Sequence, residues 1–419
     1  MLRKIRGIIN SLFYKTQRLR NGKSISVPHD FKAKTEFTLS LFLFFACCIC
    51  LFELKDKNIV FDSEVTNFFD DDNPQNVSDY KSMIEDVIKC LKKSNSPHGY
   101  ANITKVPPFF ERKKHYYNLL KKTQKYRYND FVNTWVGYQG PWIEDIWVDY
   151  FIGKKYSEFG PFVPLFVDWL NMFLITKRKM KKYHKLTKEI FDLLKPDYLY
   201  ITVTGGDQAI EGVFNTDKYP LEFPKNLLVL SASGRGHIAI LQNAKPYNVV
   251  EPLPEKNFLT FLGSFHFGRK SIIKKIQKYY KGTTKFFYGK RKDWIKTFRE
   301  SRFILSLVGN ARGCYRTDEI LELGLVPVLY FKDIEWVPYY GSKNLDWSKV
   351  GIVGTNLDDI LHKLDKIDDK ELNEMRKYIR DHHDTHFSIN GTIRQISLFL
   401  KYGFEKSSLT CSRYSKTYR

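Results

Sequence analysis

Four short apolar runs constrain the fold of this chain most strongly, because each is hydrophobic along most of its length. They are Tyr198–Thr204, Leu227–Ser231, Phe303–Val308 and Val326–Phe331, and amphipathic helical stretches separate them. A strand without a polar face must be covered on both sides, which is typical of parallel sheets packed between helices. The runs therefore predict an α/β chain, and its 419 residues suffice for two such domains, at 101–245 and 246–400.

The net charge of +22 is concentrated in three segments. Residues 1–36 carry +7, residues 265–302 carry +11 and residues 401–419 carry +4, so the rest of the chain is neutral in total. Because the excess is local, a surface that binds polyanions over the whole molecule is not the default interpretation. A nucleic-acid-binding protein remains an alternative, and it requires that the body of the chain faces the cytosol or the nucleus.

An uncharged apolar segment of sixteen residues, Phe37–Phe52, follows the first basic cluster. As a helix it would be about 24 Å long, close to the thickness of a thin bilayer, which favours a signal anchor over a buried core helix or a cleaved signal peptide. The basic residues before it predict a cytosolic tail at 1–36 and a lumenal body. Residues 53–100 are then expected to form a stem, and residues 401–419 a basic tail.

The cysteines and the glycosylation sequons agree with a lumenal body. Three cysteines lie inside the apolar segment, and the other three, Cys90, Cys314 and Cys411, permit at most one internal disulfide among them. Sequons begin at Asn76, Asn102 and Asn390. No spacing of cysteines and histidines outside the apolar segment is typical of a metal site.

The segment Phe303–Val328 contains the strongest candidate for a binding site. A strand, a loop with Gly309, and a helix that opens near Arg316 would place backbone N–H groups and a helix N-terminus where a phosphate can bind. Arg316 and Glu319 share one helix face, so the arginine can bind a diphosphate and the glutamate can accept hydrogen bonds from ribose hydroxyls. The alternative is an ordinary crossover helix with a surface Arg–Glu pair.

The order and spacing of several motifs resemble the exostosin-type glycosyltransferases. The matching motifs are Phe261–Lys270, the segment from Phe303 through Val328, Leu345-Asp346-Trp347, Phe159–Trp169 and Gly205-Gly206-Asp207-Gln208. The resemblance implies a GT-B type fold, in which two Rossmann-like domains face a cleft after a single N-terminal transmembrane anchor. It departs from the family pattern at Gln208, where the family has a histidine, and glutamine cannot act as a general base.

The resemblance also implies an inverting glycosyltransferase that uses a nucleotide-sugar, expected to be a UDP-sugar, as its donor substrate. Arg269, Gly309, Arg316 and Glu319 would bind this donor, and positive side chains would make a metal cofactor unnecessary.

The acceptor would be a glycan or a glycoprotein bound to the first domain. Asp207 and Glu211 are the candidate catalytic bases there, and His237 is expected in a solvated loop. The predicted location is the Golgi or ER membrane, with no nucleic-acid partner. A catalytically weakened relative that binds glycan or assists a partner enzyme is the second hypothesis.

Overall fold

The computed structural model describes residues 80–412, except for residues 94–102, 104, 128–141, 177–179, 208, 211–221, 243–245, 267, 282–285, 290–292 and 310. The predicted anchor at 37–52 and the predicted cytosolic tail lie outside these residues. Within the described ranges, no helix combines the length and the apolar character needed to cross a bilayer.

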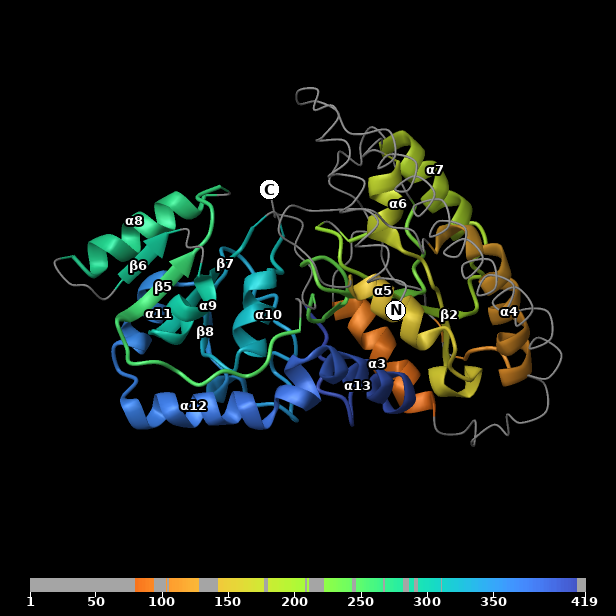
Figure 1. Cartoon of the computed structure of the whole chain (residues 1–419). Helices are drawn as coiled ribbons and strands as arrows, with labels where there is room; N and C mark the ends of the chain where they lie inside the picture. The colour runs from red at the N-terminus through yellow and green to blue at the C-terminus, as the bar shows by residue number, and fades with distance from the viewer. Residues whose placement is uncertain are drawn as a thin grey trace, which may run out of the picture. The chain divides into compact units, whose positions relative to one another are not determined.

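The first sheet has four parallel strands in the order β1-β2-β3-β4. The strands are β1 (Phe162–Pro164), β2 (Leu199–Thr204), β3 (Leu227–Ser231) and β4 (Ile238–Ala239), and all of their residues are buried. Its helical neighbours in the chain are α4 (Phe109–Lys122), α5 (Ile143–Phe151), α6 (Trp169–Ile175) and α7 (Met180–Phe191) (Figure 1). Burial on both faces explains why two of these strands read as uniformly apolar runs.

The second sheet has five parallel strands in the order β6-β5-β7-β8-β9. They are β5 (Asn257–Leu262), β6 (Phe286–Gly289), β7 (Ser301–Leu307), β8 (Pro327–Tyr330) and β9 (Ile352–Gly354). The helices between and after them are α8 (Arg269–Tyr279), α9 (Trp294–Arg299), α10 (Tyr315–Glu322), α11 (Leu357–Leu364) and α12 (Asp369–Asp381). Two parallel sheets with interspersed helices confirm the α/β fold class and fit a GT-B-like architecture.

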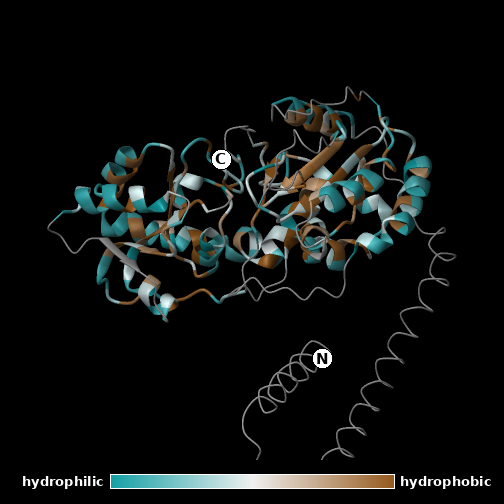
Figure 2. Cartoon of the chain, turned by 90° about the horizontal axis from the view of Figure 1, so that it is seen from above, coloured by the Kyte–Doolittle hydropathy of each residue, from teal (hydrophilic) through white to brown (hydrophobic). Residues whose placement is uncertain are grey.

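Hydrophobic residues follow the strands in Figure 2, whereas the helix ribbons alternate hydrophilic and hydrophobic residues. This alternation is expected for helices that cover a sheet with one face and meet solvent with the other. The chain also contains four single-turn helices within the described residues. They are η2 (Gln124–Tyr126), η3 (Tyr156–Phe159), η4 (Trp347–Lys349) and the π-helical η5 (His383–Phe387).

Both ends of the described chain pack against the first sheet, which corrects the predicted stem and tail. Helix α3 (Tyr80–Lys93) falls within the predicted stem, yet it buries an apolar face at helical spacing. Cys90 on this helix forms a disulfide with Cys411, within the predicted basic tail. Cys411 also forms an antiparallel bridge with Ile238 at the sheet edge. Residues up to Ser412 therefore belong to the folded body.

Helix α13 (Ile389–Tyr402) also crosses back to the first sheet, although it follows the second sheet in sequence. The ring of Phe399 stacks on Phe162 of β1, with 5.7 Å between the ring centroids. Gly160, just before β1, lies against the backbone oxygen of Leu400, where a side chain would have no room. The folded unit that contains the first sheet is thus completed by the C-terminal helix.

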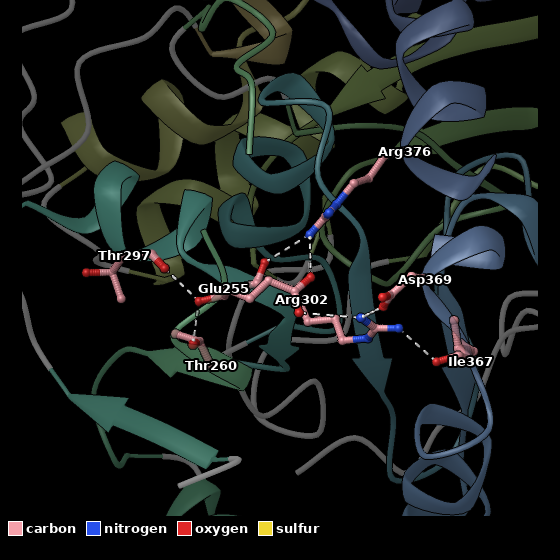
Figure 3. A network of polar contacts seen from close by, with 8 residues as sticks. Glu255, Thr260, Thr297, Arg302, Ile367, Asp369 and Arg376 are labelled. Atoms are coloured by element: carbon pink, nitrogen blue, oxygen red, sulfur yellow. Dashed lines mark hydrogen bonds and ion pairs between the residues drawn. The ribbon is translucent and has the colours of Figure 1, made fainter. Parts of the chain in front are cut away.

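An ion-pair network at the amino ends of β5 and β7 accounts for part of the basic segment 265–302 (Figure 3). Arg302 donates to the carboxylate of Glu255 over 3.4 Å, pairs with Asp369 and donates to the backbone oxygen of Ile367 over 3.0 Å. Arg376 of α12 lies 3.6 Å from the same glutamate. These charges fix α12 to the sheet at the edge opposite the carboxyl ends of its strands, so they serve the fold.

Candidate active site

The strand order of the second sheet identifies where a ligand would bind. Chain order and spatial order diverge at β5 and β7, because the connection from β5 leads to β6 on one side and the connection from β7 leads to β8 on the other. In open parallel sheets, ligands bind outside the carboxyl ends of the strands at such a switch point. The residues that follow β5 and β7 are therefore the candidate donor site.

Arg269 lies at this switch point and joins the two strand ends. It opens α8 after Gly268, whose φ of +76° lies in the left-handed region that favours glycine. Its guanidinium donates to the backbone oxygens of Leu307 over 2.7 Å and Val308 over 2.9 Å. A longer bond of 3.5 Å reaches Ser264.

Gly309 makes the position of Arg269 possible. A Cβ atom at Gly309 would lie 3.2 Å from a guanidinium nitrogen of Arg269, closer than ordinary contact. The structure thus brings these two predicted donor-site residues together. These three hydrogen bonds use three of the five N–H groups of the arginine, which leaves donors for an anionic ligand.

Arg316 and Glu319 form an ion pair on α10, with 2.7 Å between nitrogen and oxygen. The guanidinium carbon of Arg316 lies 4.9 Å from the ring centroid of Trp294 and 5.0 Å from that of Phe298. Burial raises the pKa of the Glu319 carboxyl above its usual range, against the opposing effect of the Arg316 charge. Both side chains keep about a fifth of their surface exposed, so a ligand can reach them.

The Arg–Glu pair that formed the alternative interpretation is therefore present, but it is not an ordinary surface pair. The aromatic rings hold Arg316 beside the helix N-terminus, and the ion pair orients Glu319. A ribose that accepts and donates hydrogen bonds could bind this carboxylate. No described contact joins this pair directly to Arg269, so the predicted donor residues form two groups.

The loop after β7 reaches the loop after β3 of the first sheet. The N–H of Gly313 donates to the backbone oxygen of Ser233 over 3.1 Å, and Arg312 donates to that of Gly234 over 2.6 Å. Arg312 is 3% exposed and also pairs with Asp333, which follows β8. The carboxyl ends of strands from both sheets thus meet at these loops.

Asp207, the first candidate base, lies in the loop that follows β2 and is partly buried. Glu211, the second candidate, and Gln208 lie outside the described residues. His237 is not the solvated residue that was expected: it is 7% exposed, and its Nδ1 accepts a hydrogen bond from the N–H of Val229 over 2.9 Å. This bond assigns His237 to the support of the loop between β3 and β4.

Glu144, which the sequence did not single out, lies directly beneath the Asp207 loop. It belongs to α5, is 0% exposed, and accepts a hydrogen bond of 2.6 Å from the N–H of Gly205. Burial raises the pKa of Glu144 to about 7, although the Gly205 bond acts in the opposite direction. Burial and the neighbouring charge of Glu144 also raise the pKa of Asp168, which caps α6. Two buried carboxyl groups, one of which raises the pKa of the other, occur often at functional sites.

A metal ligand set is not found among the residues that the structure describes, where no three His, Cys, Asp or Glu side chains are grouped to hold an ion.

No protein-family model and no curated protein sequence matches the chain. Several solved structures resemble it, among them the crystal structure of TarM, with 14% sequence identity and a TM-score of 0.34. The likeness covers 53% of this chain and 53% of that one, so the chain spans about half the length of that structure.

Proposed function

We propose that this chain is a glycosyltransferase that transfers a sugar from a nucleotide-sugar, preferably a UDP-sugar, to a glycan or glycoprotein acceptor with inversion. One observation carries the proposal: Arg269 and the Gly309 loop meet at the switch point of the second sheet. The exostosin-like motifs of the sequence fall on these elements. Membership of that particular family is part of the proposal.

The donor would lie across the carboxyl ends of β5 and β7. The free N–H groups of Arg269 and the N-terminus of α10 would stabilise the negative charge that develops on the departing nucleoside diphosphate. Glu319 would accept hydrogen bonds from the ribose hydroxyls, and Arg316 would lie beside the diphosphate. Because these groups supply positive charge themselves, we expect turnover to persist in the presence of EDTA.

The acceptor would bind at the carboxyl end of the first sheet. A carboxylate there must remove the proton of the acceptor hydroxyl as the oxygen attacks the anomeric carbon from the face opposite the leaving diphosphate. Asp207 is the proposed base, because it follows β2 in the loop that Glu144 supports. Glu211 stays the second candidate.

We also propose that the body lies in the lumen of the Golgi or ER, anchored by residues 37–52. The disulfide between Cys90 and Cys411 supports an oxidising compartment. Asn390 supports it too, because this sequon residue is exposed at the start of α13 and accessible to a glycan. If the proposal is correct, glycosidase treatment of the expressed chain increases its mobility on a gel, and Asn390→Gln removes one step of that shift.

The activity is tested with the full chain purified in detergent. Release of UDP is measured with a panel of UDP-sugars and simple glycan acceptors, and the variant Glu319→Gln is compared with Glu374→Gln, whose side chain is exposed on α12. We expect Glu319→Gln to reduce kcat/KM at least tenfold through one lost charged hydrogen bond, with the control unchanged. UDP binding without turnover of any donor would favour a glycan-binding or accessory protein of the same fold. Absence of both binding and turnover would refute the proposal.

A further inference from the structure

Glu144 connects helix α5 to the end of β2 through an incompletely satisfied carboxyl group. One oxygen, Oε1, accepts the hydrogen bond from the N–H of Gly205 over 2.6 Å. The other oxygen, Oε2, is buried and accepts no hydrogen bond from the residues that the structure describes. A fully buried carboxyl oxygen without a partner is costly when the group is charged, so the neutral acid suits this position better.

The loop after β2 packs directly against Glu144. A Cβ atom at Gly205 would lie 2.9 Å from Oε2 of Glu144 and 2.9 Å from Ile143, so the two segments are in direct contact. The amide of Gln242 donates to the backbone oxygen of Gly205 over 3.4 Å. The loop therefore depends on buried polar groups beneath it.

The same loop contains a strained residue, which increases its need for support. Ala209 has a φ of +51°, in the left-handed region that residues with side chains rarely adopt. Its N–H donates to the backbone oxygen of Gly206 over 2.8 Å, and Tyr183 of α7 donates to that of Ile210 over 2.9 Å. Strain of this kind persists only where the surroundings hold the backbone in place.

We propose that Glu144 is a positioning residue, which holds residues 204–207 and 209–210 of the loop after β2 in place while its carboxyl group is neutral and loosens them when it ionises. The inference rests on the proposed function in one respect, because it assumes that Asp207 in this loop serves the acceptor. Because the side chain of Glu144 is completely buried, it would act through the loop and not by contact with a substrate.

The groups around Glu144 determine the direction of the effect. Asp145 lies on its own helix, Asp168 approaches from the segment before α6, and Tyr183 faces it from α7. None of them supplies positive charge, and no salt bridge within the described residues joins Glu144 or Asp168 to a cation. Ionisation thus places negative charge among acidic or neutral neighbours, and opening the loop to water relieves this.

The magnitude follows from the difference between the closed and open states. With a pKa of about 7 in the closed loop and 4.5 when exposed, the open fraction rises roughly tenfold between pH 6 and pH 8. A pH-dependent local opening of this size is measurable without any knowledge of the substrate.

Hydrogen exchange of the loop amides in the full chain tests the inference. Protection factors, which correct for the intrinsic dependence of exchange on pH, are compared at pH 6 and pH 8 for the wild type, Glu144→Gln and Asp149→Asn. Glutamine can still accept the Gly205 bond but cannot ionise, whereas Asp149 is an exposed acid on the same helix. We expect protection to fall roughly tenfold in the wild type and in Asp149→Asn, and to stay constant in Glu144→Gln. Equal pH dependence in Glu144→Gln and the wild type would overturn the inference, as would a wild-type loop whose protection does not change.

A second readout separates this inference from the proposed function. If a donor is turned over, kcat of the wild type falls above pH 7, Glu144→Gln retains its kcat there, and KM for the donor is unchanged in both. Turnover whose pH profile is identical in the two proteins argues against positioning by Glu144. If nothing is turned over, the proposed function fails, but hydrogen exchange still decides whether Glu144 controls the loop.

Discussion

Replacement of Gly313 by alanine should destabilise the chain more than any other single added methyl group at the candidate site. A Cβ atom at Gly313 would run into the backbone oxygen of Ala232 and lie 2.8 Å from its carbonyl carbon. It would also lie 3.2 Å from the Cα atom of Ser233. These neighbours are backbone atoms at the end of β3, so no side-chain rotation relieves the overlap.

The expected cost has two parts. Overpacking at a close contact costs about 1–3 kcal/mol. Displacement of the loop also weakens the hydrogen bond of 3.1 Å from Gly313 to Ser233, which contributes about 0.5–1.5 kcal/mol. Together they predict a decrease of roughly 2–4 kcal/mol in the free energy of unfolding.

Urea unfolding of the full chain, followed by tryptophan fluorescence, measures this decrease. Gly153→Ala is the matched control, because nothing lies within 4 Å of a Cβ atom at Gly153. Alanine at such a site leaves stability unchanged or raises it by up to about 1 kcal/mol, through the unfolded state. If Gly313→Ala unfolded at the same urea concentration as the control, the close approach of the β7 loop to the β3 loop would be wrong.

Three further predictions concern pH and redox conditions. Burial alone would raise the pKa of Asp333, but the hydrogen bond that its carboxylate accepts from the buried Arg312 lowers this pKa below its usual range. The ion pair of Asp333 with Arg312 therefore stabilises the chain above about pH 4, and this stabilisation is lost as the pH falls through the lowered pKa. Asp333→Asn should lower the free energy of unfolding by about 3 kcal/mol at pH 7 and by less at pH 3, as measured by urea unfolding. The carboxylate of Glu322, whose oxygen lies 3.7 Å from Nε2 of His383, raises the pKa of this histidine. The ion pair therefore stabilises the chain fully below about pH 6.5 and less as the pH rises through the raised pKa. His383→Asn should lower the free energy of unfolding by up to about 1 kcal/mol at pH 6 and not at all at pH 9. Without reductant, Cys90→Ser should lower the free energy of unfolding by roughly 2–5 kcal/mol, because it removes the disulfide. The control Cys314→Ser, at a free cysteine, should leave it unchanged, and dithiothreitol should abolish the difference between Cys90→Ser and the wild type.

The four strands that the sequence predicted are buried along all or nearly all of their length. The predicted run Leu227–Ser231 coincides with β3, and Val326–Phe331 contains β8. In contrast, β4 and β9 have two and three residues, too few to show a hydrophobic pattern. The presence of a continuous apolar run, which is a local property of the sequence, therefore decided which strands could be predicted.

The packing of the two chain ends against the first sheet could not be predicted, because it depends on contacts between residues that are far apart in the sequence. Helix α3 lies in a segment rich in acidic residues, asparagine and serine, which resembles a stem in composition. Its place in the folded body depends on the C-terminal segment, to which the disulfide between Cys90 and Cys411 joins it. These two cysteines are 321 residues apart in the sequence, so no local pattern shows this contact. The count of cysteines permitted one disulfide but could not choose among the three possible pairs.

The pairing of Arg316 with Glu319 was predictable because the two residues are close in the sequence. Arg316 and Glu319 are three apart on a helix, a spacing that alone places them on one face. Arg269 required the additional fact that β5 and β7 are neighbours, which the strand order supplies and the chain order does not. Spacing could not show that the two arginines belong to separate groups of contacts.

Glu144 illustrates what sequence spacing cannot reveal on the acceptor side. In the sequence it is an acid in the first turn of a helix, where negative charge is common and favourable because of the helix dipole. Its raised pKa instead follows from complete burial and from acidic neighbours that the fold brings near it. A helix dipole offers at most about 2 kcal/mol, whereas a shift from 4.5 to about 7 corresponds to roughly 3 kcal/mol in the opposite direction, so burial outweighs the local preference. The buried carboxyl group of Glu144 therefore lowers the stability of the chain, although acids are favourable at its position in the helix. Such a cost is expected where a residue supports a neighbouring loop and does not stabilise its own helix.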